Sequence, residues 1–593
     1  MIYAAEEMGI ALRNSAYSPN IKERMDHSCA TFDEKKRLIA QAEHIPVHLG
    51  SMAWGVRHGL EHFSQRLEDG DMILFNDPYI GGTHLPDLTL IAPIFHRGQI
   101  IAYAANKAHH SDVGGKVPGS MAGDSTELHQ EGLIIPPVKF ARKEEIDDNI
   151  ASMILRNVRT PQTRMGDLRA QMAANILGRK RLLELANTYG TDTLREAMEE
   201  IMNYSERLTR AAIRRMPKGR YEAEDYLDDT GVSEKPVKIK VAVTIDDDRI
   251  HVDYSGTDGQ VEGPLNAVFG VTISGVYYSI KCITDPTIPT NDGCFRPIEV
   301  YAPEGSLLNP TPPAPVAGGN VETSQRNVDA LLKAFAKAVP EKVCAACQGT
   351  MNNVTVGGID TKTGKAWSFY ETIAGGFGGR LGLDGVDAIH SHMTNTMNTP
   401  MEATEPIYSL RFVTYMMRPD SGGPGKWRGG VGVERSWTLE SGKATVSIMA
   451  ERNKIAPWGV LGGKPGAKGE YYLVRAKGTK MKLRSKCTIE MNAGDRLIVH
   501  SPGGGGYGGP LQREPRKVLD DVINGLVSPK SARDNYGVVI DRSLRLNTSA
   551  TERLRSQMRV NQHRRSDPRR RWKRCPPKRI GFANTRFDAR PGD

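Results

Sequence analysis

The chain has 593 residues, of which 39% are hydrophobic and 25% charged, a composition typical of a globular protein with ample core. No apolar stretch approaches the ~20 residues of a membrane-spanning helix, so we expect no membrane segment. The net charge of +10 arises at one end, because residues 551–593 hold 14 Lys and Arg against 4 Asp and Glu. The rest of the chain is neutral, and we expect no nucleic-acid partner.

The N-terminus and the cysteines indicate a cytoplasmic protein. The chain begins Met1-Ile2-Tyr3 and reaches Glu6 and Glu7 at once, without the basic and apolar regions of a signal peptide. Seven cysteines are an odd and scattered set for so long a chain, which favours reduced thiols over a disulfide framework. The expected localisation is therefore the cytoplasm.

Hydrophobic patterns predict mixed helices and strands in the first part of the chain. Met8 and Leu12 stand one helical turn apart near the N-terminus. Residues 88–95 and 100–104 have the apolar character of strands, and the polar residues 96–99 between them predict a hairpin with a four-residue loop.

Later segments extend this pattern. Two amphipathic helices are expected within residues 167–216, with Gly190 ending the first, and alternating residues over 237–254 predict a hairpin. Glycine makes up 61 of the 593 residues, which predicts many tight turns and close backbone approaches, above all in the C-terminal third.

These patterns predict an α+β fold of several subdomains, with a metal-binding α/β part first and a β-rich, glycine-rich part last. The predicted divisions are an N-terminal helix/strand domain at residues 1–220, a central mixed domain at 221–400, a β-rich domain at 401–545 and a basic, disordered tail at 546–593.

The expected hairpin over 88–104 brings polar side chains to one open end. If Phe95 pairs with Ile100, Asp87 lies opposite Ala108 and emerges beside His109. His84 stands three residues before Asp87 on the adjoining loop. Two imidazoles and a carboxylate at one strand end make a plausible divalent-metal site, suited to Mn²⁺, Zn²⁺ or Fe²⁺.

Other polar residues flank this site. Asp77, His110 and Asp112 are near enough in sequence to be extra ligands or partners of the ligands. The alternative is that all these residues form turns and caps, because Asn and Asp often bond their own backbone in loops.

Other motifs give weaker signals. Cys344 and Cys347 form a lone pair without a His at zinc-finger spacing, which favours ordinary core cysteines. His390, His392, Thr394 and Asn395 form a polar cluster that could line a pocket, although a hydrogen-bonded loop is favoured. No nucleotide-binding fingerprint stands out, so a second chain is expected to bind ATP if ATP is used.

Several long motifs resemble the hydantoinase B/oxoprolinase family. The resemblance runs from residue 1 to about residue 540 and rests on many segments in order. They include 18–24 (SPNIKER), 41–50 (QAEHIPVHLG), 76–87 (NDPYIGGTHLPD), 108–115 (AHHSDVGG), 157–161 (NVRTP), 394–396 (TNT) and 501–508 (SPGGGGYG).

The resemblance implies one subunit of an ATP-dependent enzyme whose hydantoinase A-type partner binds ATP and Mg²⁺. Members of the family open hydantoins or 5-oxoproline, whereas the acetone and acetophenone carboxylase group carboxylates ketones. The family's metal ligands correspond to His84, Asp87 and His109 here, with Asp26 as a further acid.

The resulting hypothesis is an ATP-dependent hydrolase of a small cyclic amide. Metal-activated water would attack the ATP-activated amide, and catalytic roles fall to Asp26, Asp112 and His110. One alternative is the metal-containing subunit of a ketone carboxylase. Another is a non-catalytic scaffold with a polyanion-binding tail.

Overall fold

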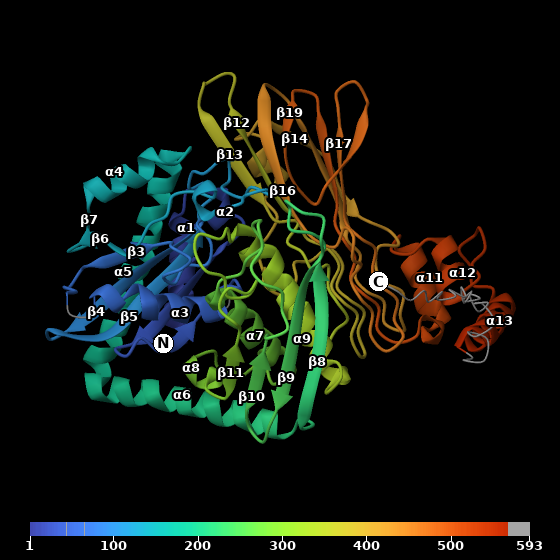
Figure 1. The fold of residues 1–593 in the computed structure, drawn as a ribbon, viewed down its shortest axis with the longest axis horizontal. Helices are drawn as coiled ribbons and strands as arrows, with labels where there is room; N and C mark the ends of the chain where they lie inside the picture. Colours follow the sequence, from blue (N-terminus) through green and yellow to red (C-terminus); the bar gives the residue numbers. More distant parts are fainter. Residues whose placement is uncertain (43, 64–65, 567–593) are drawn as a thin grey trace, which may run out of the picture. The chain divides into compact units, whose positions relative to one another are not determined.

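The computed structural model describes residues 1–42, 44–63 and 66–566. The chain forms two compact units, Met1–Arg513 and a second unit that begins at Glu514. Helices and strands alternate through the first unit, so the predicted mixed fold is confirmed (Figure 1). The boundaries expected at residues 220 and 400 fall inside this unit and stay predictions. Among the described residues, no helix combines the length and apolar character needed to cross a bilayer.

A seven-stranded sheet forms the N-terminal part, in the order β2-β1-β5-β4-β3-β6-β7 (Figure 1). Its strands are β1 (His27–Asp33), β2 (Leu38–Gln41), β3 (Met72–Phe75), β4 (Asp87–His96), β5 (Gln99–His109), β6 (Val138–Arg142) and β7 (Glu145–Ile146). Every residue of β1, β2 and β3 is buried, because helices cover both faces of the sheet.

Alternate residues of β5 face different helices. Ala102 and Ala104 share a core with Met8 and Leu12 of α1, whereas Ala105 joins the core that holds residues of α3. A Cβ at Gly178 of α5 would lie 2.4 Å from the Met8 sulfur, so glycine permits this close packing. The helices of the first unit are α1 (Ile2–Ser15), α2 (Pro19–Lys22), α3 (His48–Gly59), α4 (Asp148–Arg156), α5 (Pro161–Tyr189), α6 (Thr191–Arg214), α7 (Phe269–Ile283), α8 (Asp292–Phe295), α9 (Ser324–Phe335) and α10 (Met401–Thr404).

The two helices predicted within 167–216 are confirmed as α5 and α6. Gly190 separates them with a φ of +83°, a left-handed value that glycine adopts at little cost. The hairpin predicted over 237–254 is confirmed as well. It belongs to a four-stranded sheet of β8 (Gly219–Leu227), β9 (Val237–Ile245), β10 (Ile250–Asp253) and β11 (Ile298–Tyr301).

Two antiparallel sheets form the C-terminal part of the first unit and share one hydrophobic core. The first contains β12 (Asn353–Ile359), β13 (Ala366–Glu371), β16 (Lys443–Met449) and β19 (Lys486–Asn492). The second contains β14 (Leu410–Met417), β15 (Val433–Leu439), β17 (Glu470–Val474), β18 (Lys480–Leu483) and β20 (Arg496–His500).

Glycine-rich segments beside these sheets stack backbone against backbone. The amide of Gly430 donates to the carbonyl of Phe377 at 2.7 Å, and that of Gly504 donates to Gly430 at 2.9 Å. A Cβ at Gly504 would lie only 2.1 Å from the Phe377 oxygen. The close backbone approaches predicted from the glycine content are therefore confirmed.

The second unit is a small helical body. Its helices are α11 (Pro515–Ile523), α12 (Pro529–Tyr536) and α13 (Thr548–Ser566). The buried hydroxyl of Thr551 accepts a hydrogen bond from the Val539 amide at 3.0 Å, and Arg555 donates to the Tyr536 carbonyl at 3.0 Å. These contacts hold α13 without an apolar stripe, so the disorder predicted from residue 546 is wrong for residues 548–566. The rest of that segment, 567–593, lies outside the described residues.

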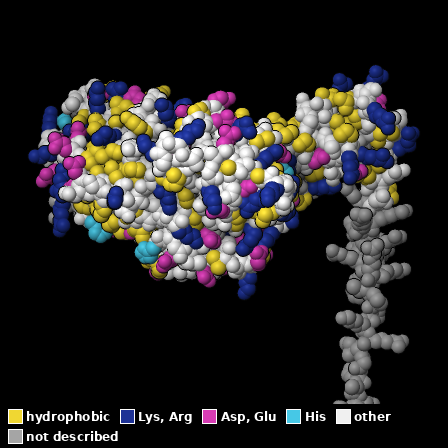
Figure 2. Space-filling view, turned by 90° about the horizontal axis from the view of Figure 1, so that it is seen from above, with side chains coloured by type: hydrophobic (Ala, Val, Ile, Leu, Met, Phe, Trp, Pro, Cys, Tyr) yellow, Lys and Arg dark blue, Asp and Glu magenta, His cyan; other side chains and the backbone are white. Residues whose placement is uncertain are grey.

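Charges of both signs cover the surface of the first unit. Figure 2 shows Lys and Arg side chains mixed with Asp and Glu over its visible face, with apolar side chains between them. This mixture agrees with the neutral charge of the chain ahead of residue 551. No single-sign surface of that face therefore suggests a polyanion partner for this unit.

Candidate metal centre

The candidate site lies at the open end of the β4–β5 hairpin. His96 pairs with Gln99 and Phe95 with Ile100, but the register shifts by one residue after Ile94. As a result Asp87 pairs directly with His109, and the expected pairing of Asp87 with Ala108 is corrected. The physical reason is a bulge, in which one strand carries an extra residue and the pairing beyond it moves by one position.

His84, Asp87 and His109 converge at this end. Nε2 of His84 lies 3.1 Å from Oδ1 of Asp87, and Nδ1 of His109 lies 3.2 Å from the same oxygen. Bonds of about 2.0–2.2 Å from a metal to N and O ligands place tetrahedral ligand atoms roughly 3.3–3.5 Å apart. The three side chains are buried, and one metal-binding atom of each lies within 4.8 Å of the others. This spacing fits a divalent ion.

The unpaired atoms of the two imidazoles also fit a metal site. Neither ring nitrogen of His84 makes a hydrogen bond of good geometry, and Nε2 of His109 has no partner among the described residues. Burial lowers the pKa of His84, although the nearby charge of Asp87 acts in the opposite direction. A neutral imidazole keeps the lone pair that a metal ligand needs.

Asp87 is held as a carboxylate by several donors. Thr83 Oγ1 donates to Oδ2 at 2.6 Å, and the His48 ring faces the same oxygen at 3.4 Å. Burial by itself would raise the pKa of Asp87, but the charge of His84 and hydrogen bonds from His109, His48 and His84 prevail. The pKa therefore lies well below its usual range, and the charged form is available to a cation.

Asp26 faces the same cavity as Asp87 and His109. The cavity is small, about 20 Å³, which is room for a single water molecule or ion. The Asp26 carbonyl accepts a hydrogen bond from the His109 amide at 3.0 Å, so the two residues are fixed to each other. Met25 precedes Asp26 with a φ of +57°, an unfavourable value for a residue with a Cβ.

Distant segments complete the walls of this cavity. Tyr370 of β13 stacks on the His109 ring, with centroids 4.6 Å apart and an interplanar angle of 19°. Asn320, in the π-helical turn Gly319–Thr323 ahead of α9, points its amide toward Asp87 at 3.5 Å. The hydroxyl-bearing residues Thr372, Thr394 and Thr396 line the cavity too.

Sequence reasoning missed these wall residues, apart from naming Thr394 in a cluster that could line a pocket. Asn320 and Tyr370 lie hundreds of residues from Asp87 in the chain, so no local spacing connects them. His48 stands in a motif that resembles the family, which is the one signal that could have drawn attention to it.

The other predicted residues lie elsewhere. His110 faces Gln171, with Nε2 2.9 Å from Oε1, and burial together with the charge of Arg164 lowers its pKa to about 4. Asp77 accepts a hydrogen bond from the Tyr79 amide at 2.9 Å. Neither residue is among those lining the cavity, so their roles as ligands or catalysts stay predictions.

Asp112 is fully engaged in a loop. Its two oxygens accept hydrogen bonds from the amides of Gly114, Gly119 and Arg159 at 3.0–3.1 Å, and from the Arg159 guanidinium at 2.9 Å. These contacts favour a role in fixing residues 112–119. The catalytic role assigned to Asp112 stays a prediction that its contacts do not favour.

Comparisons with known proteins place the chain in a family. It is 46% identical to an uncharacterized protein of Methanocaldococcus jannaschii over 91% of this chain and 94% of that one. It is 34% identical to the putative B-type chain of a D-/L-hydantoinase of Pseudomonas sp., over 93% and 95% of the two chains. With 5-oxoprolinase 1 of Arabidopsis thaliana the identity is 36% over 85% of this chain, which spans only 40% of that relative's length.

Solved structures agree. The ATP-dependent caprolactamase from Pseudomonas jessenii superposes with a TM-score of 0.87 and 30% identity, covering 93% of this chain and 97% of that one. A nucleotide-free acetone carboxylase structure shares the fold with a TM-score of 0.90 at 21% identity, covering 96% of this chain and 83% of that one. The family model described as Hydantoinase B/oxoprolinase matches residues 1–510. The chain therefore belongs to the hydantoinase B/oxoprolinase family.

Proposed function

We propose that this chain is the metal-bearing subunit of an ATP-dependent enzyme that opens a small cyclic amide. The observation that carries the proposal is the buried cluster of His84, Asp87 and His109, which faces a cavity shared with Asp26. Relatives named as a 5-oxoprolinase and as part of a D-/L-hydantoinase, and the similar caprolactamase structure, support this class of substrate.

The chemistry explains why both ATP and a water-activating site are needed. An amide in a small ring is a poor electrophile, and phosphate transferred from ATP to its carbonyl oxygen creates a good leaving group. Water then adds to the former carbonyl carbon, the phosphate leaves with its oxygen, and the C–N bond of the ring breaks. The ring nitrogen takes up a proton, so amide, ATP and water give an amino acid, ADP and phosphate.

The residues around the cavity have matching roles. A divalent ion held by His84, Asp87 and His109 would lower the pKa of water toward ~7. Asp26 stands at the same cavity, where its carboxylate can accept the proton of attacking water. Arg24, whose guanidinium lies 3.9 Å from the Asp26 carboxylate, offsets that charge in a buried setting.

A neighbouring pocket has room for the substrate. Its volume is about 260 Å³, and Ile45 lines both this pocket and the metal cavity. Pro46, Leu49 and Tyr278 give it a largely apolar wall, whereas Asn395 adds a polar group. An apolar pocket with few polar groups suits a small lactam, whose ring is apolar and whose amide needs one or two hydrogen bonds.

The proposal includes a hydantoinase A-type partner that binds ATP and Mg²⁺. Support comes from the absence of a nucleotide-binding fingerprint in the sequence and from the relative whose name makes it one of the chains of a hydantoinase. Because the chain spans about two fifths of the 5-oxoprolinase relatives, the rest of that longer protein is the natural counterpart of a separate partner.

Ketone carboxylation is the second candidate function. The fold likeness to acetone carboxylase favours it, since the same metal cavity could serve an enolate in place of water. A scaffold role with a polyanion-binding tail is the third candidate. Removing residues 567–593 separates it from the others, because turnover should persist and only polyanion binding should fall.

The test is ATP consumption by the chain together with its A-type partner. 5-Oxoproline, hydantoins, caprolactam and a ketone with bicarbonate are offered in turn, and products are identified by mass. Amide-dependent ATP turnover with a ring-opened product supports the hydrolase. Turnover that needs both ketone and bicarbonate would overturn it in favour of the carboxylase.

A further inference from the structure

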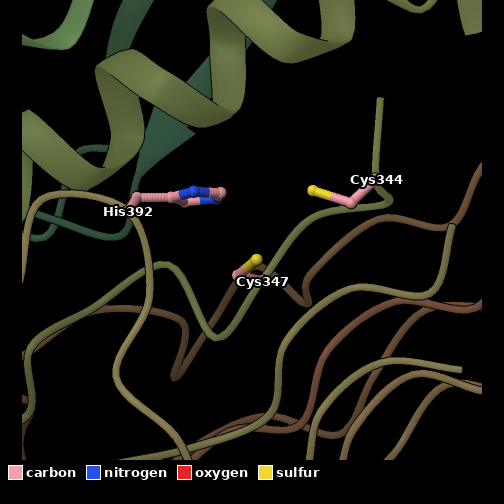
Figure 3. Close-up of side chains that lie close together, drawn as sticks. All are labelled: Cys344, Cys347 and His392. Atoms are coloured by element: carbon pink, nitrogen blue, oxygen red, sulfur yellow. The ribbon is translucent and has the colours of Figure 1, made fainter. Parts of the chain in front are cut away.

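Cys344, Cys347 and His392 form a second buried cluster, outside the candidate metal centre. One metal-binding atom of each side chain lies within 4.8 Å of the others. Figure 3 shows the two thiol groups and the His392 ring converging from separate loops. The sequence favours ordinary core cysteines because no His stands at finger spacing, whereas the fold brings His392 to them from a distant loop.

Asp329 adds a carboxylate to this cluster. Its Oδ1 lies 3.5 Å from Nε2 of His392, and among the described residues neither atom makes a hydrogen bond of good geometry. Both side chains are almost fully buried. Buried polar atoms without hydrogen bonds are rare, and an ion between them is one physical explanation.

Both ring nitrogens of His392 face an oxygen atom. Nδ1 lies 3.5 Å from the Tyr278 hydroxyl, and Nε2 faces Asp329. Metal-binding histidines commonly direct the nitrogen that is not bound to the metal at such a group, which fixes the orientation of the ring. His392 is therefore oriented as a ligand whichever of its nitrogens binds.

The backbone around the cluster supports the same conclusion. His392 has a φ of +50°, a conformation that costs energy for a residue with a Cβ. The Gly378 amide donates to the Cys347 sulfur at 3.3 Å, a hydrogen bond that favours a charged thiolate. A bound cation would offset both the strain and the buried charge.

Neighbouring charges suit a cation with two thiolates. Arg452 donates to Oδ2 of Asp329 at 2.5 Å, and Arg326 lies 3.7 Å from the same oxygen. This leaves Oδ1 free to face His392. Two thiolates then balance a divalent ion, so the cluster buries little net charge.

We propose that Cys344, Cys347 and His392 hold a zinc ion, with Asp329 supplying the adjacent oxygen. Zn–S bonds of about 2.3 Å and Zn–N bonds of about 2.0 Å place tetrahedral ligand atoms roughly 3.3–3.8 Å apart, so small side-chain rotations from the observed spacing suffice. Thiolate ligands select zinc over the oxygen-seeking Mg²⁺ and Mn²⁺.

This zinc ion stabilises one wall of the candidate metal centre. Met393 and Thr394 directly follow His392 and line the first cavity. The Met393 carbonyl accepts a hydrogen bond from the Val47 amide at 3.3 Å, which joins this loop to the residue before His48. Fixing His392 therefore fixes the loop that encloses the first site.

The first experiment measures zinc in the full-length chain after dialysis against a weak chelator. We expect one zinc ion that is retained in Asp87→Asn and lost in Cys347→Ser. Cys294→Ser is the matched control, because Cys294 is equally buried but its sulfur hydrogen-bonds to the Asn291 carbonyl, outside the cluster. Zinc that persists in Cys347→Ser but falls in Asp87→Asn would overturn the proposal.

The second experiment needs no variant and covers the case in which Cys347→Ser does not fold. The zinc of the wild-type chain is exchanged for Co²⁺, and the near-ultraviolet spectrum is recorded. Thiolate-to-cobalt charge-transfer absorption is expected, and a mercurial reagent should abolish it while releasing one metal ion. Absence of that absorption, or a Cys344–Cys347 disulfide found by mass spectrometry of the untreated chain, would contradict the proposal.

Discussion

Asp87 and His109 are paired directly across the β4–β5 hairpin, with Nδ1 of His109 3.2 Å from Oδ1 of Asp87. A shift in register after Ile94 creates this pairing; without it, Asp87 would face Ala108. A bulge thus aims two ligand-type side chains at one point, a use of bulges that is common beside functional sites.

Thr83 should tune the metal affinity of this pair. Its hydroxyl donates to Oδ2 of Asp87 at 2.6 Å and orients the carboxylate. Thr83→Val keeps the shape of the side chain but removes the donor, and metal affinity should fall by about 10–100-fold. Competition with a metal-binding dye measures the change.

Thr83→Ser is the matched control, because it restores the hydroxyl and should return the affinity to within a few-fold of wild type. Equal losses in Thr83→Val and Thr83→Ser would show that packing of the methyl group, rather than the hydrogen bond, matters.

Asp112 and Asp87 should behave differently although both lie in motifs of the same resemblance. Asp112→Asn replaces a charged acceptor of four hydrogen bonds by an amide, which should lower the free energy of unfolding by about 1–3 kcal/mol. Its metal content should stay at the wild-type level. Asp87→Asn should lose the metal ion and at least about 100-fold of the activity.

Urea unfolding and metal analysis of the two variants check this contrast. If Asp112→Asn lost the metal ion or the activity while its stability was unchanged, Asp112 would belong to the catalytic machinery.

The hairpin end could be predicted because its parts are local in sequence. Asp87 and His109 stand at the ends of two apolar runs joined by a short turn, so their convergence follows from strand pairing alone. His48, Asn320 and Tyr370 could not be found this way, since tertiary packing brings them to the site from other elements. The same holds for His392, which only the folded chain places beside Cys344 and Cys347.

Some residues gave a correct position and an ambiguous role. Asp112 and Asp87 look alike in sequence, as carboxylates in glycine-rich polar loops. Only the structure shows that Asp112 spends its lone pairs on backbone amides and Arg159, whereas Asp87 faces two imidazoles. Likewise, a lack of apolar periodicity suggested disorder over α13, but polar contacts of Thr551 and Arg555 hold that helix.

Glu131 should make stability depend on pH. Burial raises the pKa of Glu131 to about 8, and hydrogen bonds from the Val316 and Ala317 amides only partly counteract this. Since the folded-state pKa exceeds the unfolded value, the contribution of Glu131 to stability is full below the unfolded pKa. It is lost as the pH rises toward 8.

Glu131→Gln keeps an acceptor for both amides but does not titrate. The midpoint of thermal unfolding should therefore fall less in Glu131→Gln than in the wild type between about pH 5 and pH 8. Parallel pH profiles of the two proteins would mean that Glu131 has an ordinary pKa.

The most direct measurement is product formation by the complex of this chain with its A-type partner, before and after metal removal. With a cyclic amide and ATP, the metal-loaded complex should form ring-opened amino acid and phosphate together. Metal-free complex should lose turnover, regain it when the ion is returned, and fail to regain it in Asp87→Asn. Full ring opening by the metal-free complex would contradict a role for His84, Asp87 and His109 in the reaction.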